Sequence, residues 1–196
     1  MRVVSLLPSA TESLCLIGGE RFLIGRSHEC DDPTSITDRP ILTSQRTAFT
    51  TSAEVDRAVS DALAGGHSLY HLDGDRLRDL APDLILTQDL CSVCSIDLEA
   101  VRRAAATIDP APRVLSLNPH SFEDVLDDLL RIGQAVGVER EAREAVVALR
   151  NRFFSAADFV NPYEEARPVV LPQWTDPPFV GGPWTPPLPA THPTPP

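Results

Sequence analysis

Short apolar runs alternate along the chain with longer stretches in which apolar residues recur at helical spacing. The first run is Val3–Leu7, and five more are expected as strands, at Phe22–Gly25, Ile41–Thr43, Pro82–Thr87, Arg113–Leu117 and Arg167–Leu171. Runs that are apolar throughout are typical of strands covered on both faces. Their alternation with helices predicts an α/β fold, a parallel-sheet lobe with helices on both faces.

Polar residues that can cap a helix precede most of the helical stretches. Ser9–Glu12 and Thr51–Glu54 both have the capping-box pattern, in which a hydroxyl and a Glu three residues later bond each other's backbone amides. The first helix is expected to run to about Ile17. Further helices are expected at Asp73–Leu80, from Ser95 or Asp97 to Ala105, from Ser121 to Val136, and at Glu139–Ala156.

The net charge of −11 argues against a nucleic-acid partner, because phosphate backbones bind basic surfaces. No apolar run approaches the roughly 20 residues that a membrane-spanning helix needs. The N-terminal apolar run stops at Pro8, too short for a secretory signal, so a cytoplasmic location is expected. The sequence carries none of the glycine-rich nucleotide motifs, nucleophile motifs or zinc-protease motifs, which indicates a protein that is not an enzyme.

Polar and sulfur-bearing residues gather at one end of the expected strands. They follow the strands as Pro8-Ser9, Ser27–Cys30, Ser44–Arg46, Gln88–Cys91 and Asn118–His120. The opposite strand ends carry ordinary turn residues. Because the carboxyl ends of parallel strands meet at one edge of a sheet, where α/β folds bind ligands, the sequence predicts a small-molecule site at this edge.

Four blocks resemble the cobalamin-binding branch of the two-lobed substrate-binding proteins of ABC importers. They are RVVSLLPSATE at Arg2–Glu12, GRSHECD at Gly25–Asp31, PDLILTQDLC at Pro82–Cys91 and QWTDPPF at Gln173–Phe179. Their order and spacing together are more specific than any block alone. The resemblance implies a corrinoid, cobalamin or a related molecule, bound between two lobes that one long helix joins. It also implies an ABC permease as partner and, for many family members, a periplasmic or other extracytoplasmic location.

This family pattern divides the chain into four parts. Residues 1–137 are the N-terminal α/β lobe, residues 138–160 the helix that connects the lobes, and residues 161–182 the first strand and loop of a truncated second lobe. Residues 183–196 are a proline-rich tail, expected to be disordered. Ten of the last 25 residues are Pro, which supports neither a helix nor a central strand. A frameshift and a natural short form would both explain such a truncation.

The resemblance and the strand-end positions together give a set of candidate ligand-binding residues. They are Pro8, Ser9, His28, Glu29, Cys30, Gln45, Arg46, Asp89, Leu90, Cys91, Trp174, Pro178 and Phe179. The rings of Trp174 and Phe179 offer flat apolar surface to a large ring system. His28 has two interpretations: its imidazole ligates cobalt, or it makes a loop-ordering hydrogen bond with Glu29 or Asp31.

The cysteines suggest a second function. Cys91 and Cys94 form a C-x-x-C motif, and His28 and Cys30 lie on another loop of the same edge, a combination that suits zinc or an iron–sulfur cluster. Because neighbouring strands lie close together, Cys30 is expected to approach the Cys91/Cys94 pair. Reduced thiols without a metal are the alternative. Corrinoid binding, a cysteine-based metal or redox protein on the same fold, and an inactive fragment are therefore the competing functions.

Overall fold

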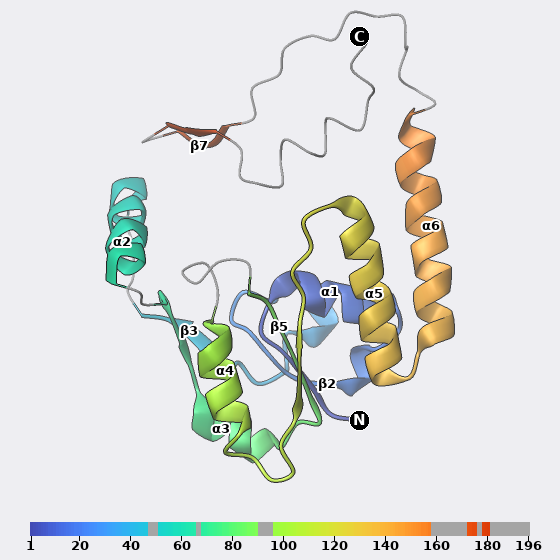
Figure 1. Cartoon of the computed structure of the whole chain (residues 1–196), viewed down its shortest axis with the longest axis horizontal. Helices are drawn as coiled ribbons and strands as arrows, with labels where there is room; N and C mark the ends of the chain where they lie inside the picture. Colours follow the sequence, from blue (N-terminus) through green and yellow to red (C-terminus); the bar gives the residue numbers. More distant parts are fainter. Residues whose placement is uncertain (47–50, 66–67, 90–95, 158–171, 176–177, 181–196) are drawn as a thin grey trace, which may run out of the picture.

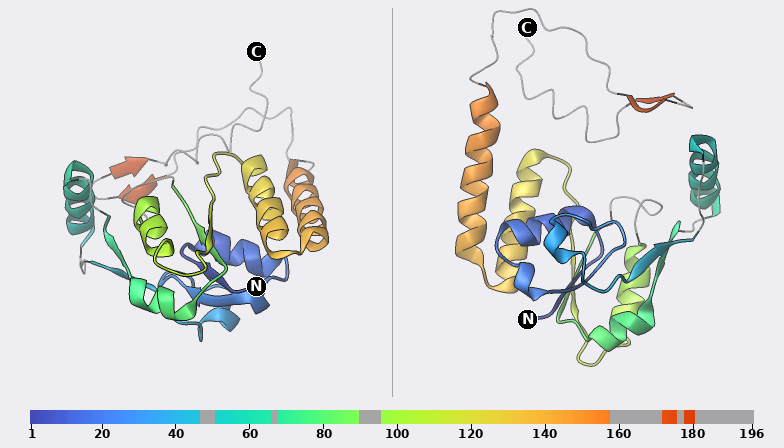
Figure 2. Two further views of the ribbon diagram at one scale, coloured as in Figure 1. Left: turned by 60° about the horizontal axis from the view of Figure 1, so that its bottom comes forward. Right: turned by 180° about the vertical axis from the view of Figure 1, so that it is seen from behind.

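The computed structural model of the chain describes residues 1–46, 51–65, 68–89, 96–157, 172–175 and 178–180 (Figure 1). A four-stranded parallel sheet in the order β2-β1-β5-β6 forms its centre. The strands are β1 (Val3–Ser5), β2 (Leu23–Arg26), β5 (Leu84–Thr87) and β6 (Arg113–Ser116). Helices cover both faces of this sheet (Figure 2), which confirms the fold class expected from the sequence.

Alternate residues of the central strands face two separate hydrophobic cores. Val3, Leu84 and Leu86 belong to one core, whereas Val4 and Ile85 belong to the other. Each of these five residues has at most 1% of its surface exposed. A strand with a core on each side has no polar face, and this is why the strands appear in the sequence as continuous apolar runs.

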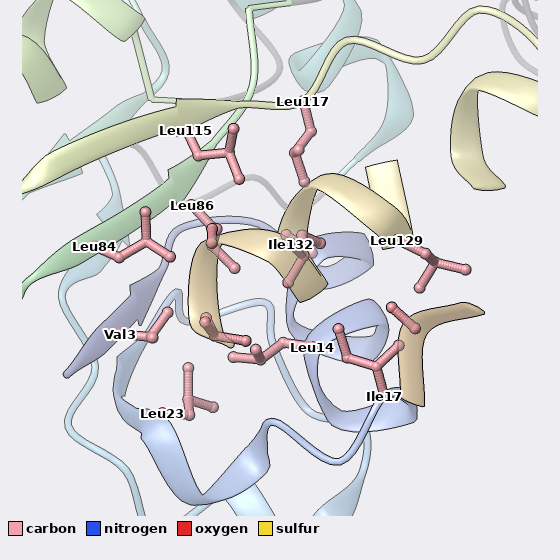
Figure 3. Packing of buried hydrophobic residues seen from close by; sticks show 14 of the residues in the cluster. Val3, Leu14, Ile17, Leu23, Leu84, Leu86, Leu115, Leu117, Leu129 and Ile132 are labelled. Atoms are coloured by element: carbon pink, nitrogen blue, oxygen red, sulfur yellow. The ribbon is translucent and has the colours of Figure 1, made fainter. Parts of the chain in front are cut away.

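The first core lies between the sheet and three helices, α1 (Pro8–Leu16), α5 (Phe122–Val136) and α6 (Glu139–Ala157). Leu14 of α1 and Ile132 of α5 lie near the strand residues in this cluster (Figure 3). The outermost helix, α6, packs along α5, with the rings of Phe122 and Phe153 stacked at a centroid distance of 4.1 Å. The helix expected at Glu139–Ala156 is thus confirmed, while its role as a connector between lobes stays a prediction.

The second core lies under α3 (Gly74–Leu80) and α4 (Leu98–Ala105), which contribute Leu77 and Val101 to it. Each helix is capped by the aspartate before it, whose carboxylate accepts from backbone amides of the first turn, Asp73 from Arg76 N at 2.9 Å and Asp97 from Ala100 N at 3.1 Å. Of the two starting residues that the sequence offered for the second of these helices, the structure selects Asp97.

The third strand expected from the sequence, Ile41–Thr43, overlaps the observed strand only at Thr43. Ile41 makes only an isolated parallel bridge to Arg26. The strand β3 (Thr43–Gln45) pairs instead in antiparallel fashion with β4 (Tyr70–Leu72), a strand that the sequence pattern did not indicate. The partner strand comes from later in the chain, and the pairing joins Thr43 to Leu72 and Gln45 to Tyr70. We call this two-stranded sheet the β3–β4 ribbon.

The helix α2 (Ser52–Gly65) connects the two strands of the ribbon in sequence. In space it lies beyond the end of the ribbon that is remote from the parallel sheet (Figures 1 and 2). Its predicted capping box is confirmed. Thr51 N donates to Glu54 Oε2 at 3.1 Å, and Glu54 N donates to Thr51 Oγ1 at 3.3 Å. Ser121 caps α5 in the expected way, accepting from Asp124 N at 3.1 Å.

The capping box predicted at Ser9 is wrong. Helix α1 begins two residues earlier than this box predicts, at Pro8, and its N-cap is the extended Leu7, whose side chain makes no capping bond. Proline favours the first helical position because its fixed backbone angle already suits a helix. It also lacks an amide hydrogen, and an amide at this position would have no partner within the helix. Ser9 therefore lies inside the helix rather than at its start.

Two short 3₁₀ helices, η1 (Glu20–Phe22) and η2 (Thr34–Ile36), lie in the connections on either side of β2. The last described elements, β7 (Pro172–Thr175) and β8 (Pro178–Val180), pair as an antiparallel hairpin. The expected strand at Arg167–Leu171 and the tail at 183–196 lie outside the described residues. Within the described part of the chain, no helix combines the length and the apolar character that a bilayer crossing requires.

Candidate functional site

A small pocket lies at the carboxyl edge of the parallel sheet, where the residues that follow β1 and β2 meet the β3–β4 ribbon. Its lining residues are Leu6, Leu7, Pro8, Ser27, His28, Glu29, Thr43, Tyr70, Gln88 and Ile96. The pocket has a volume of about 30 Å³. That is room for one or two water molecules, so a large ligand would lie over the pocket rather than inside it.

His28 contributes a half-buried imidazole to this pocket, and the hydroxyl of Thr43 contacts both its backbone and its ring. The backbone N–H of His28 donates to Thr43 Oγ1 at 3.0 Å, and the ring atom Nδ1 lies 2.7 Å from the same oxygen. The other ring nitrogen, Nε2, is shielded from solvent and has no hydrogen-bond partner among the described residues. The loop-ordering bond of His28 is therefore made with Thr43, and not with Glu29 or Asp31 as the sequence suggested.

Tyr70 and Glu29 form the outer side of the pocket. The ring of Tyr70 lies beside the imidazole of His28, with a centroid distance of 5.6 Å and an angle of 48° between the planes. Its hydroxyl donates to Glu29 Oε1 at 3.0 Å. A residue of the ribbon is thus joined to the loop after β2, and its ring lies beside the His28 imidazole.

The loop that carries His28 and Glu29 is organised by the buried side chain of Arg26. The guanidinium donates to three main-chain carbonyls, those of Ser27, Cys30 and Thr37. Among the described residues no carboxylate pairs with this cation. Backbone carbonyls therefore supply the negative ends of dipoles that a buried charge requires, and the loop is held in one conformation.

Cys30 points away from the pocket and into the first core, where 1% of its surface is exposed. Thr11 Oγ1 of α1 lies 3.1 Å from its sulfur. Burial raises the pKa of the Cys30 thiol, and the Thr11 hydrogen bond acts against this rise. Cys15 lies on α1 one turn after Thr11 and is half-buried. Its pKa is raised to about 11, chiefly by burial.

The other candidate ligand-binding residues are distributed as follows. Pro8 lines the pocket, whereas Ser9 is exposed and lines a separate groove between α1 and α5. Gln45 and Arg46 are exposed at the end of β3, and Arg46 Nε donates to Tyr70 O at 2.9 Å. The exposed Asp89 bonds through its backbone N–H to Asn118 Oδ1 at 2.7 Å, so these two strand ends are joined at the same edge.

The remaining candidates lie outside the described residues or on the β7–β8 hairpin. Leu90, Cys91 and Cys94 lie outside the described residues, so the approach of Cys30 to the cysteine pair stays a prediction. Trp174, Pro178 and Phe179 belong to the β7–β8 hairpin, which is described by its backbone, with Trp174 paired to Phe179 across the two strands. Of the residues that the structure describes, no three His, Cys, Asp or Glu side chains are grouped as metal ligands would be.

Thr43 and Tyr70 are site residues that the sequence interpretation missed. Both lie on the β3–β4 ribbon. They meet His28 only because β3 and β4, which α2 separates in the sequence, pair with each other. A Thr at the start of a strand and a Tyr in a connection carry no local sign of a binding site. The ribbon itself has one short local sign: Tyr70, His71 and Leu72 follow the apolar–polar–apolar order of a half-exposed strand.

No protein-family model matches the chain, and no curated protein matches it either. Solved structures do. The periplasmic heme-binding protein HutB of Vibrio cholerae matches with a TM-score of 0.64 and 16% identity over 88% of this chain. The periplasmic heme-binding protein RhuT from Roseiflexus sp. RS-1 matches with a TM-score of 0.63 and 17% identity over 91%. The periplasmic vitamin B12 binding protein BtuF of Vibrio cholerae matches with a TM-score of 0.60 and 15% identity over 90%.

These three matches define the class of fold. The chain has the α/β lobe architecture found in periplasmic ligand-binding proteins. It spans 54%, 58% and 57% of the length of HutB, RhuT and BtuF respectively. At such low identity the likeness establishes the shared fold, and the ligand has to be inferred from this chain's own residues.

Proposed function

We propose that the chain is a ligand-binding lobe of the substrate-binding-protein type and that its ligand is a tetrapyrrole-type molecule. The finer proposal is a corrinoid, such as cobalamin or cobinamide, delivered to an ABC permease. The corrinoid assignment rests on the four sequence blocks that resemble the cobalamin-binding branch. Three of these blocks contribute to the pocket: Arg2–Glu12 and Gly25–Asp31 supply Leu6, Pro8, His28 and Glu29, and Pro82–Cys91 supplies Gln88.

The observation that carries the proposal is the unpartnered Nε2 of His28. Native proteins satisfy nearly all of their buried polar atoms, so each exception calls for an explanation. Leaving such a group without a partner costs about 1–3 kcal/mol. A ligand that supplies the missing partner would regain this free energy, and the atom lies at the sheet edge where α/β folds bind their ligands.

The size of the pocket determines how such a ligand would lie. A volume of about 30 Å³ admits a single polar group of the ligand, with the ring system spread over Pro8, Glu29 and Tyr70. Tyr70 is half-buried and its ring lies beside His28. We therefore propose that Tyr70 turns aside when the ligand enters and that its bond to Glu29 breaks. Proteins normally cover most of the surface of a ligand of this size. In this proposal a second lobe covers the face of the ligand that the present lobe leaves open.

A titration tests the proposal on the full 196-residue chain. Cyanocobalamin, cobinamide and hemin are added separately, and binding is followed by absorbance and by calorimetry. We expect saturable binding of a corrinoid, weakened about tenfold or more by His28→Ala, the loss that an unpaired buried group predicts. His71→Ala is the matched control, because His71 is exposed on β4 next to Tyr70 and lines no part of the pocket.

The outcomes separate the coarse proposal from the finer one. Binding of hemin alone would keep the tetrapyrrole class and reject the corrinoid. Failure of all three ligands to bind a folded chain would reject the proposed function. Binding that His28→Ala and His71→Ala leave equally unchanged would place the ligand elsewhere on the molecule.

A further inference from the structure

The hydrogen bonds that the Thr43 hydroxyl can make determine which ring nitrogen of the neutral His28 imidazole carries the proton. A threonine hydroxyl has one proton to donate and two lone pairs that accept. The backbone N–H of His28 takes up one lone pair of Thr43 Oγ1. The short contact of 2.7 Å between Oγ1 and His28 Nδ1 then has two forms, in which either the hydroxyl or the imidazole supplies the proton.

The two forms differ in how many buried groups they leave unsatisfied. If the hydroxyl donates to Nδ1, its proton is used and only Nε2 of the imidazole lacks a partner. If Nδ1–H donates instead, the hydroxyl proton also needs an acceptor, and the described residues provide none for it. Thr43 is 5% exposed, so its hydroxyl is largely shielded from bulk solvent. The first form leaves one buried group unpaired and the second leaves two.

We infer that Thr43 holds His28 as the tautomer with its proton on Nε2, so that the pocket presents an N–H donor that recognises an acceptor oxygen on the ligand periphery. This inference rests on the proposed function and names the chemistry of recognition within it. Coordination of a metal by Nε2 would require a free lone pair there and the proton on Nδ1. Thr43 is thus a positioning residue: it favours the tautomer of His28 that donates a hydrogen bond over the tautomer that could bind a metal.

Two kinds of ligand carry such an oxygen. Corrinoids have peripheral amide side chains, and hemin has propionate carboxylates. Glu29 lines the same pocket, and the chain as a whole carries a net charge of −11. A carboxylate entering beside Glu29 would be repelled, whereas an amide oxygen would not. The neutral acceptor is therefore the better match.

The tautomer is measured without any ligand. Long-range ¹H–¹⁵N correlation spectra of histidine-labelled protein distinguish a protonated ring nitrogen from an unprotonated one, and the spectrum of His28→Gln assigns the signals. We expect protonated Nε2 and unprotonated Nδ1 in the wild type and in Thr43→Ser, which keeps the hydroxyl. Thr43→Val should shift the population towards a mixture. A wild-type spectrum with the proton on Nδ1 would overturn the inference.

Binding distinguishes recognition by a donor from recognition by a metal. Dicyanocobinamide has both axial positions of cobalt occupied, so it should bind as well as aquocyanocobinamide if the contact is peripheral. His28→Gln keeps an N–H donor and should retain affinity within a few-fold, whereas His28→Leu should lose about tenfold. Strong preference for the aquo form, with equal losses in the Gln and Leu variants, would show metal coordination and reject the inference.

The remaining outcomes are also decisive. Tighter binding of hemin than of cobinamide, again retained by His28→Gln, would assign the carboxylate as the acceptor. If no ligand binds while the spectra show protonated Nε2, the proposed function fails together with the acceptor claim, and the tautomer assignment stands alone. Thermal unfolding of each variant, followed by circular dichroism, checks that a loss of binding is not a loss of fold.

Discussion

The Nη1 atom of Arg26 lies 2.7 Å from the carbonyl oxygen of Cys30, so the last residue of β2 holds the loop that carries His28. The same guanidinium donates to Thr37 O at 2.8 Å and to Ser27 O at 3.2 Å. Arg26 is 7% exposed. One buried side chain therefore joins three points of the loop from Ser27 to Thr37, the loop that carries the imidazole.

Replacement of this guanidinium should weaken both the fold and the site. Arg26→Lys keeps the charge, but a single ammonium group cannot match the planar fork that reaches three carbonyls. We expect the free energy of unfolding to fall by about 2 kcal/mol, the cost of lost bonds and a poorly solvated buried charge. Urea denaturation measures the change. Arg102→Lys, at an exposed site on α4, is the control, and equal stability of the two variants would contradict the role given to Arg26.

Asp128 should show a pH-dependent cost of burial. Its side chain is 11% exposed, its Oδ1 atom accepts from Arg131 Nη1 at 2.6 Å, and Oδ2 has no described partner. Burial raises the pKa of this carboxyl above its ordinary value of 3.8, against the opposing effect of Arg131. The folded state therefore binds the proton more tightly than the unfolded chain does. This contribution is complete below the ordinary pKa and is lost as the pH rises through the raised one.

Asp128→Asn removes the buried charge and keeps an oxygen for Arg131. At pH 7 we expect the free energy of unfolding to rise by about 1 kcal/mol, and the gain should shrink as the pH falls towards 4. Urea denaturation at pH 7, 5 and 4 tests this, with the exposed neighbour Asp127→Asn as control. A loss of stability at pH 7 would mean that the pair with Arg131 outweighs the cost of burial.

Gly133 permits the close approach of α5 and α6. A Cβ atom at this position would lie 2.4 Å from the Cβ of Ala142. Gly133→Ala should therefore destabilise the protein by about 1–3 kcal/mol through overpacking, although alanine favours a helix over glycine by about 1 kcal/mol. The double variant with Ala142→Gly should recover part of the loss. Gly74→Ala, where a Cβ meets nothing within 4 Å, is the control, and a stabilised Gly133→Ala would contradict the packing.

Cys15 should be unreactive at neutral pH despite being half-exposed. Its pKa of about 11, raised by burial first and by Glu20 and Asp32 next, leaves very little of the nucleophilic thiolate. In a Cys91→Ser/Cys94→Ser background, alkylation of Cys15 by iodoacetamide should accelerate about tenfold per pH unit from pH 8 to 10. Peptide mass spectrometry measures the rate. Saturation of the rate near pH 9, as in the urea-unfolded control, would show an ordinary thiol.

The features that the sequence predicted correctly depend on neighbours in the chain. Thr51 and Ser121 cap helices by reaching amides three residues away, so a short window of sequence contains the whole interaction. The capping box at Ser9 failed within such a window, because Pro8 competes for the start of the same helix. The central strands were evident because a core on each side leaves them no polar face.

The site was predicted only to the extent that it follows the ends of the parallel strands. His28 and Glu29 were found this way, since they directly follow β2. Tyr70 and Thr43 come from a ribbon whose strands meet across an intervening helix, and nothing local to either residue specifies that pairing. The role of Thr43 depends further on the 2.7 Å contact with one ring atom, a detail that only three-dimensional packing creates.

The pairing of Gln45 with Tyr70 has a consequence for how relatives of this chain can diverge. The segment between these two residues leaves and re-enters the ribbon at adjacent points, and α2 lies at the ribbon's far end (Figure 1). The entropy of closing a loop changes only slowly with its length. Insertions, deletions or a different ornament in place of α2 can therefore accumulate over evolution while His28, Thr43 and Tyr70 keep their mutual geometry.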